Sequence, residues 1–196
     1  MALTQEFYET DKSRGFVRGY TFNAHGSRPL GLAKNLAAKA GIWGKDLYRI
    51  MRDYNFYAQI TLVGEVLPNP DNCVTLGNEK DEYGIPRPLI TFSYSENDNK
   101  LIAHGVRTAN EILQAIGGEP AFVIPDTGHL MGGTRMGNDP ASSVVDGFCR
   151  SHDIPNLYIC SASTFVTSGG GNPTETVMAI ASRTADHIIK TSKAQG

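Results

Sequence analysis

Two glycine-rich stretches decide how this chain is interpreted: GHLMGGTRMG at residues 128–137 and SGGGNPTET at residues 168–176. Four glycines within ten residues of the first stretch favour neither a helix nor a strand, but they let the backbone pass close to a bulky planar ligand. A histidine in such a loop can accept a proton near neutral pH, so His129 is a candidate general base. From the residues alone, the alternative is that His129 only caps or cross-links the loop.

The second stretch predicts the start of a helix. Asn172 stands where an N-cap residue belongs, Pro173 fits the first helical position, and Glu175 falls where a capping box has its acidic residue. The predicted helix covers residues 174–190. Free N–H groups and the helix dipole at such an end favour negative charge. Asn172 is therefore either a cap alone or part of a helix end that faces a developing negative charge.

The preceding residues predict mainly strands and helices flanking them. Residues 1–15 are polar and predict a loop, and residues 29–54 favour helix. An amphipathic helix is expected from an N-cap region at residues 95–98 to about Ile116, where two glycines end it. Strands are expected at residues 16–24, 57–67, 73–76, 88–94 and 156–160. The fold class is α+β, an antiparallel sheet with flanking helices followed by a C-terminal strand–loop–helix.

Composition narrows the function classes. The chain has 196 residues, 40% of them hydrophobic, and a net charge of −2, typical of one globular domain or a large piece of one. Its 18 Lys and Arg are scattered, so nucleic acid is not expected as a partner. The three cysteines are widely spaced and form no C-x-x-C motif, which argues against a disulfide framework and against a metal site.

Several other reactions find little support in the sequence. There is no G-x-G-x-x-G turn, no phosphate-binding G-x-x-x-x-G-K-[ST] loop and no G-x-S-x-G nucleophile elbow. A hydrolase that pairs His129 with a serine from residues 161–168 is therefore disfavoured. Arg135 is interpreted as a tether of the glycine loop. The remaining histidines are interpreted as surface or packing residues: His25, His104, His152 and His187.

The order of the C-terminal motifs resembles the signature of the glucose–methanol–choline (GMC) oxidoreductase family. The motifs are HLMG at 129–132, TRMG at 134–137, DP at 139–140, SVVD at 143–146, NLY at 156–158 and NPT at 172–174. They are most similar to those of bacterial dehydrogenases of sugars, polyols and sugar acids. Two positions depart from the family: Gly133 stands where threonine is common, and Ser161 replaces a usual acidic residue.

The resemblance implies a specific chemistry. GMC enzymes oxidise CH–OH groups by hydride transfer to N5 of flavin adenine dinucleotide (FAD). It implies that His129 is the general base and that Asn172 hydrogen-bonds and orients the same hydroxyl. It also implies that the helix end at Pro173 stabilises the reduced flavin ring. The residues expected to line the flavin are Cys160, Ser161, Ala162, Ser163, Asn172, Pro173 and Thr174.

The same resemblance predicts the domain organisation. Residues 1–124 would be part of the substrate-binding sheet domain, and residues 125–196 a catalytic segment that completes the FAD-binding domain. The family's N-terminal dinucleotide-binding domain has no counterpart in this sequence. We therefore expect a piece of a longer chain, or half of a split enzyme, that binds flavin weakly and is inactive alone.

Three kinds of partner are expected under this interpretation. They are an alcohol or sugar substrate, the missing N-terminal FAD domain, and an electron-acceptor protein or cytochrome subunit. The alternative function is a non-catalytic accessory or binding module that retains the GMC fold. The sequence alone specifies neither the substrate nor the electron acceptor, and it assigns no compartment.

Overall fold

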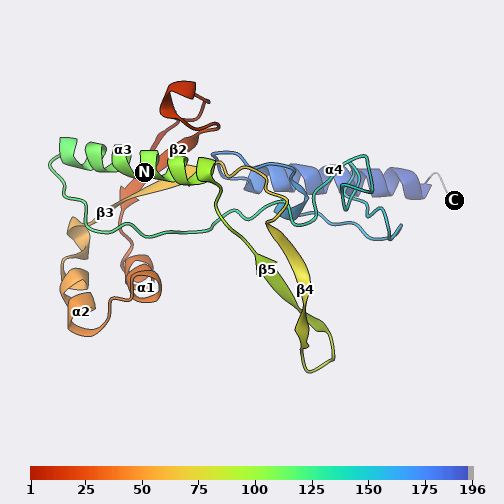
Figure 1. Cartoon of the computed structure of the whole chain (residues 1–196), viewed down its shortest axis with the longest axis horizontal. Helices are drawn as coiled ribbons and strands as arrows, with labels where there is room; N and C mark the ends of the chain where they lie inside the picture. The colour runs from red at the N-terminus through yellow and green to blue at the C-terminus, as the bar shows by residue number, and fades with distance from the viewer. Residues whose placement is uncertain (194–196) are drawn as a thin grey trace. The chain divides into compact units, whose positions relative to one another are not determined.

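A three-stranded antiparallel sheet organises the first of two units into which the chain divides, residues 1–65 with 97–128 (Figure 1). The structure is a computed structural model that describes residues 1–193. The strands are β1 (Ala2–Thr4), β2 (Tyr20–Gly26) and β3 (Ala58–Gly64), with β2 in the centre. Along its whole length β2 pairs with β3, from Tyr20 opposite Gly64 to Gly26 opposite Ala58.

Helix α3 (Glu96–Ala115) packs on this sheet and closes the core of the unit. Leu101 on the helix is 2% exposed and clusters with three aromatic residues, Phe16, Tyr20 and Phe22. The approach is close at Gly105, where an added Cβ would lie 1.8 Å from Cδ1 of Leu62 on β3. Glycine at this point of the helix therefore lets the sheet side chain fill the space that a larger residue would take.

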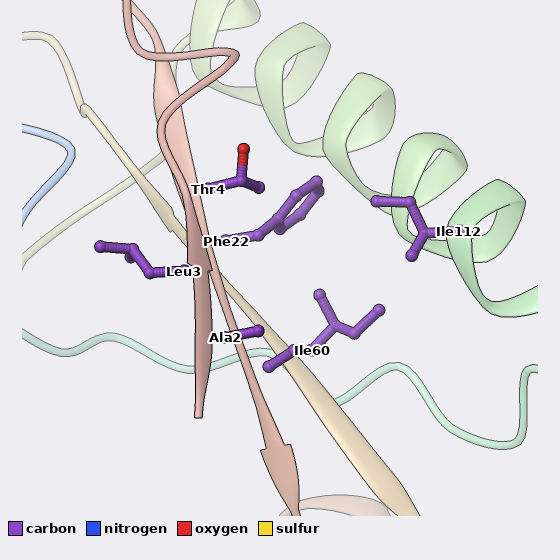
Figure 2. A pocket seen from close by; sticks show the side chains of 7 residues that line it. Ala2, Leu3, Thr4, Phe22, Ile60 and Ile112 are labelled. Atoms are coloured by element: carbon purple, nitrogen blue, oxygen red, sulfur yellow. The ribbon is translucent and has the colours of Figure 1, made fainter. Parts of the chain in front are cut away.

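An apolar hollow of about 170 Å³ remains between the sheet and the far half of α3 (Figure 2). Phe22 and Ile60 from the sheet and Ile112 from the helix point into it, whereas Leu3 points away. Its lining is almost wholly carbon, with the Thr4 hydroxyl at the edge.

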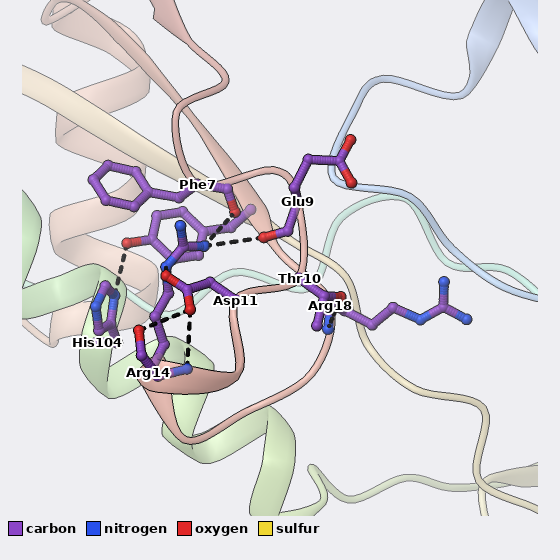
Figure 3. Close-up of polar contacts among 9 residues, drawn as sticks. Phe7, Glu9, Thr10, Asp11, Arg14, Arg18 and His104 are labelled. Atoms are coloured by element: carbon purple, nitrogen blue, oxygen red, sulfur yellow. Dashed lines mark hydrogen bonds and ion pairs between the residues drawn. The ribbon is translucent and has the colours of Figure 1, made fainter.

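The segment between β1 and β2 is held by polar contacts at the other end of the sheet (Figure 3). It contains a short 3-10 helix, η1 (Lys12–Arg14), capped by Asp11, whose carboxylate accepts from the Ser13 N–H at 2.9 Å. The Arg14 guanidinium donates to the carbonyl of Phe7 and lies over its ring. His104 of α3 lies 2.9 Å from the Tyr20 hydroxyl and contacts Phe16 edge-on. These contacts make His104 a packing residue, as predicted.

Helices α1 (Pro29–Ala40) and α2 (Gly44–Arg52) connect β2 to β3 beyond one end of the sheet (Figure 1). Gly41, in the left-handed conformation with φ of 67°, ends α1. Leu36 of α1 is fully buried. A 3-10 helix, η2 (Tyr54–Phe56), follows α2 and leads into β3.

The second unit, residues 66–96 with 129–193, contains a two-stranded hairpin and a long helix. Strands β4 (Cys73–Lys80) and β5 (Pro86–Thr91) pair antiparallel, with Val74 opposite Ile90. Residues 129–173 are mostly irregular apart from η3 (Ala162–Thr164), and α4 (Thr174–Lys193) follows them.

The α+β class is confirmed, but several boundaries differ from the predictions. The predicted strand at 16–24 begins only at Tyr20, and residues 29–54 form two helices joined at a left-handed glycine. The prediction of a strand at 156–160 is wrong, because Tyr158 makes a single bridge to Arg150. Cys149, with φ of 64°, turns the partner segment away from a continuing ladder. The predicted boundary near residue 124, between a substrate-binding domain and a catalytic segment, stays a prediction.

Among residues 1–193, no helix combines the length and hydropathy that a membrane span requires.

Candidate active site

His129 lies at the start of the first glycine-rich stretch, residues 128–137, in an uncommon backbone conformation. Its φ is 55°, in the left-handed region that non-glycine residues seldom occupy, although histidine tolerates it better than most. The imidazole is exposed and makes no side-chain hydrogen bond to any of residues 1–193. Gly128 and Gly133 on either side have open space where a Cβ would stand. The histidine is therefore free of structural hydrogen bonds and has clear surroundings.

The chain after His129 runs beside η3. Gly132, Thr134 and Met136 donate backbone N–H groups to the carbonyls of Ala162, Ser163 and Thr164, at 3.4, 2.8 and 2.8 Å respectively. These alternate residues bind successive carbonyls of the short helix. The structure thus brings the His129 loop together with Ala162 and Ser163, two of the residues expected to line the flavin.

Three hydroxyl groups connect the same two segments. The Thr134 hydroxyl is hydrogen-bonded to that of Ser163 at 2.6 Å, and Ser163 is bonded to the hydroxyl of Ser161 at 2.5 Å. Ser161 also caps η3, because its side chain accepts from the Ser163 N–H at 3.1 Å. The serine that replaces the usual acidic residue therefore still provides an oxygen to cap this turn. Thr134 was not among the predicted site residues.

Cys160 and Cys149 lie side by side on paired segments, since the N–H of Ile159 donates to the Cys149 carbonyl at 2.9 Å. Cys160, one of the residues expected to line the flavin, is exposed. Cys149 is fully buried, and burial raises the pKa of its thiol. Its role is therefore in packing.

Asn172, Pro173 and Thr174 lie where α4 begins, and the helix starts at Thr174 as predicted. The first residue of the helix is Thr174, and the Pro173 carbonyl accepts from the N–H of Val177 at 3.0 Å. Pro173 therefore takes the cap position that the sequence suggested for Asn172. The Asn172 side chain is exposed and makes no hydrogen bond to any other described residue. Its amide is thus not used in capping.

The glycine run before Asn172 is anchored at its first residue. The Ser168 hydroxyl accepts from the N–H of Val66 and donates to the Val66 carbonyl, both at 3.1 Å. Beyond this anchor, Gly171 has open space where a Cβ would lie. Residues 169–171 are all glycine, so they place no side chain of their own in front of the α4 N-terminus.

A second network shapes the loop between His129 and Cys149. The Arg135 guanidinium donates to the Ser142 carbonyl at 2.7 Å, which supports the prediction that it tethers this loop. Nε2 of His152 lies 3.0 Å from the Ser143 hydroxyl and 3.1 Å from the Gly137 carbonyl. The Ser143 hydroxyl also donates to the backbone carbonyl of Asp139, so the contact between Ser143 and His152 stabilises the conformation of this loop.

The far end of α4 is fixed by aromatic stacking. The rings of His187 and Phe148 stack at 4.0 Å, and the Thr184 hydroxyl donates to the Phe148 carbonyl at 3.2 Å. His187 is thus a packing residue, as predicted.

Comparison with known proteins places this architecture in a family. A family model described as GMC oxidoreductase matches residues 68–181, more than half of the chain. The match includes the hairpin of the second unit, both glycine-rich stretches and the start of α4. The chain belongs to the GMC oxidoreductase family.

Three proteins similar to this chain are dehydrogenases by name. The chain is 35% identical to the 2-methyl-1,2-propanediol dehydrogenase of Mycolicibacterium austroafricanum, over 95% of this chain and 36% of that protein. It is 36% identical to the fructose dehydrogenase large subunit of Gluconobacter japonicus, over 89% of this chain and 32% of that protein. The chain is 30% identical to the gluconate 2-dehydrogenase flavoprotein of Pantoea cypripedii, over 85% of this chain and 29% of that protein. The chain thus spans about a third of the length of these relatives.

Proposed function

We propose that this chain forms the substrate-facing part of an FAD-dependent oxidoreductase that oxidises CH–OH groups of sugars, polyols or sugar acids. The observation that carries the proposal is His129, an exposed histidine that follows Gly128, is held in a left-handed conformation and makes no side-chain hydrogen bond to any of residues 1–193. A backbone of this kind at a site that matches a dehydrogenase family supports a catalytic role. The GMC relatives named as dehydrogenases support the reaction class.

Two side chains carry the proposed chemistry on the substrate side. The His129 imidazole would take the hydroxyl proton as the alcohol becomes a carbonyl, which requires its nitrogen within about 3 Å of that hydroxyl. The Asn172 amide would hydrogen-bond the same oxygen and keep the C–H bond in line for transfer. When bound, FAD supplies the acceptor for the hydride that leaves the carbon.

The residues around the site are compatible with a planar cofactor. Glycines 128, 133 and 171 have open space at the Cβ position, so the backbone can lie close to a ring system. The first turn of α4 presents N–H groups and the positive end of its dipole, which favour negative charge. Cys160, Ser161, Ala162, Ser163, Asn172, Pro173 and Thr174 would line the flavin.

The GMC relatives also suggest partners for the whole protein. Two of them are named as a large subunit and as a flavoprotein, which fits enzymes assembled from several components. We propose that an N-terminal FAD-binding domain, in the same polypeptide or a separate one, completes the site. An electron-acceptor protein or a cytochrome subunit would then reoxidise the flavin.

The test is anaerobic bleaching of the flavin in the protein that the gene encodes together with any upstream coding sequence. Purified protein should be yellow and should lose its flavin absorption on addition of a diol, fructose or gluconate. His129→Ala should keep the colour, and the rate at which substrate bleaches the flavin should fall by a factor of about 10² to 10⁴. Asn172→Ala should slow bleaching less, and Asn172→His should restore part of the rate.

A matched control is His25→Ala, since the His25 ring contacts only the neighbouring Gly26 carbonyl. This variant should bleach at the normal rate. Normal bleaching by His129→Ala would remove the histidine from the mechanism. If the protein is colourless, and still binds no FAD when it is combined with the products of neighbouring genes, the accessory-module alternative would be favoured. Hydrolysis of an activated ester that depends on His129 would favour the hydrolase alternative.

A further inference from the structure

The exposed side of α2 combines aromatic and basic side chains. Lys45, Tyr48, Arg49 and Arg52 have spacings of three and four residues, so they share one face of the helix. Leu47, Ile50 and Met51 lie on the opposite face and are half-buried. Trp43 precedes the first turn of α2 as its N-cap residue. These five outward residues, Trp43, Lys45, Tyr48, Arg49 and Arg52, are called the α2 face below.

Large apolar side chains of residues 28–56 are exposed. Trp43 is 67% exposed and Tyr48 69%, and just outside the α2 face Leu30 at the start of α1 is 87% exposed. Phe56 in η2 is 90% exposed. The β4–β5 hairpin exposes large apolar side chains as well, among them Leu76 at 76% and Ile90 at 71%. The α2 face is distinguished by the combination of exposed aromatic rings with positive charge.

The charge of this region is opposite to that of the rest of the chain. Residues 28–56 contain six Lys or Arg and two Asp, a net charge of +4, whereas the whole chain carries −2 and the remaining residues therefore carry −6. Both aspartates bond arginines of the α2 face: Asp46 accepts from Arg49 at 3.2 Å, and Asp53 from Arg52 at 2.8 Å. Exposed pairs of this kind are weak. Lys39 of α1 pairs with Asp126 at 2.6 Å, but Lys45 makes no ion pair with any of residues 1–193, so the α2 face keeps a net positive charge.

We propose that the α2 face binds the anionic surface of a lipid bilayer. Exposed aromatic rings beside lysine and arginine, as on the α2 face, are typical of segments that lie at a membrane–water interface. The indole and phenol groups can enter the headgroup region while the cations remain hydrated beside anionic lipids. Covering the same face with an apolar protein surface would instead cost the desolvation of three cations.

The sequence supplies a built-in reporter for this proposal, because Trp43 is the only tryptophan of the chain. On addition of vesicles of equal parts phosphatidylglycerol and phosphatidylcholine, its emission should shift to shorter wavelength and become quenchable by brominated lipid. Vesicles of phosphatidylcholine alone should produce little shift. Binding should weaken as salt is raised, since surface charges are screened.

The decisive variant is Lys45→Gln/Arg49→Gln/Arg52→Gln. At about a tenfold loss for every 1.4 kcal/mol and about 1 kcal/mol per cation, its partition into the anionic vesicles should fall on the order of 100-fold. The matched control, Lys12→Gln/Lys80→Gln/Lys190→Gln, removes three exposed cations elsewhere and should bind within a few-fold of the unaltered chain. Circular dichroism establishes that both variants keep the helical content of the unaltered chain.

Three results would overturn the proposal. One is the absence of any spectral shift with anionic vesicles, and another is equal binding to phosphatidylcholine alone. The third is a larger shift with soluble polyglutamate than with vesicles, which would assign the α2 face to an acidic protein partner. None of these outcomes depends on flavin or on turnover, so the proposed oxidoreductase function is tested separately.

Discussion

The close contact at Gly105 yields a prediction whose sign differs from that of an ordinary helix substitution. In an open helix position, replacing glycine by alanine stabilises a protein by about 1 kcal/mol. At Gly105 an added Cβ would lie 1.8 Å from Leu62 Cδ1, whereas carbon atoms in contact are about 3.5–4.0 Å apart. One of the two groups must therefore move by about 2 Å. Such overpacking costs about 1–3 kcal/mol, and we take the upper end because the Leu62 side chain packs against the core.

The net expectation for Gly105→Ala is a loss of about 2 kcal/mol, because the helix gain offsets only part of the overpacking. In a domain of this size that loss lowers the melting temperature by roughly 4–8 °C. Urea denaturation followed by circular dichroism measures it directly. The matched control is Gly31→Ala on α1, where the nearest atom is 3.9 Å from the added Cβ. That change should stabilise the chain by about 0.5–1 kcal/mol.

A double-mutant cycle separates the contact from other effects. Leu62→Ala alone should cost about 2 kcal/mol, the lower end of the range for a partly buried leucine. In that background Gly105→Ala no longer meets a side chain, so it should stabilise by about 1 kcal/mol. The two sites would then couple by about 3 kcal/mol. If Gly105→Ala stabilises the unaltered chain as Gly31→Ala does, the packing of α3 on β3 described above is incorrect.

Further expected outcomes concern the core, pH and the candidate site. Leu101→Ala should destabilise the chain by about 2–5 kcal/mol in urea titration, since Leu101 is 2% exposed within the aromatic cluster. Burial lowers the pKa of His104 below 6.5, so the unfolded chain binds more protons than the folded chain and stability should fall as the pH drops below 6.5. When the urea midpoint is measured at a series of pH values, His104→Gln should show a smaller fall of the midpoint in this range. Thr134→Val removes the 2.6 Å bond to Ser163 and should cost about 1 kcal/mol, with faster proteolysis within residues 128–137. A thiol reagent should label the two exposed cysteines of the native chain quickly and Cys149 only after unfolding, because that thiol is buried and its pKa is raised.

Periodic segments of the sequence predicted their own structure well. The amphipathic pattern after Ser95 predicted a helix to about Ile116, and α3 ends at Ala115. The strand predicted at residues 73–76 begins where β4 begins, at Cys73, although β4 continues to Lys80. The apolar run at 156–160 was misleading, because a strand requires a partner of sufficient length and Tyr158 has only one bridged neighbour. Local composition cannot supply that information.

The sequence predicted which residues form the candidate site, but it did not predict the contacts that hold the site together. The motif order singled out His129 and Asn172, and the structure shows both exposed and without structural hydrogen bonds among residues 1–193. Thr134 and Ser168 could not be found in this way. Each acts through a contact with a segment far along the chain, 29 residues away for Thr134 and 102 for Ser168, and no local pattern specifies such a pairing. Their roles depend on tertiary structure.

The bond between Ser168 and Val66 also bears on how the protein is made. The second unit consists of residues 66–96 and 129–193, so a ribosome delivers its hairpin well before the segment that completes it. Meanwhile β4 and β5 expose Val74, Leu76 and Ile90 on one face. All of the first unit lies within residues 1–128, so that unit can fold first. The nascent hairpin is therefore the part of this chain for which a chaperone would matter most.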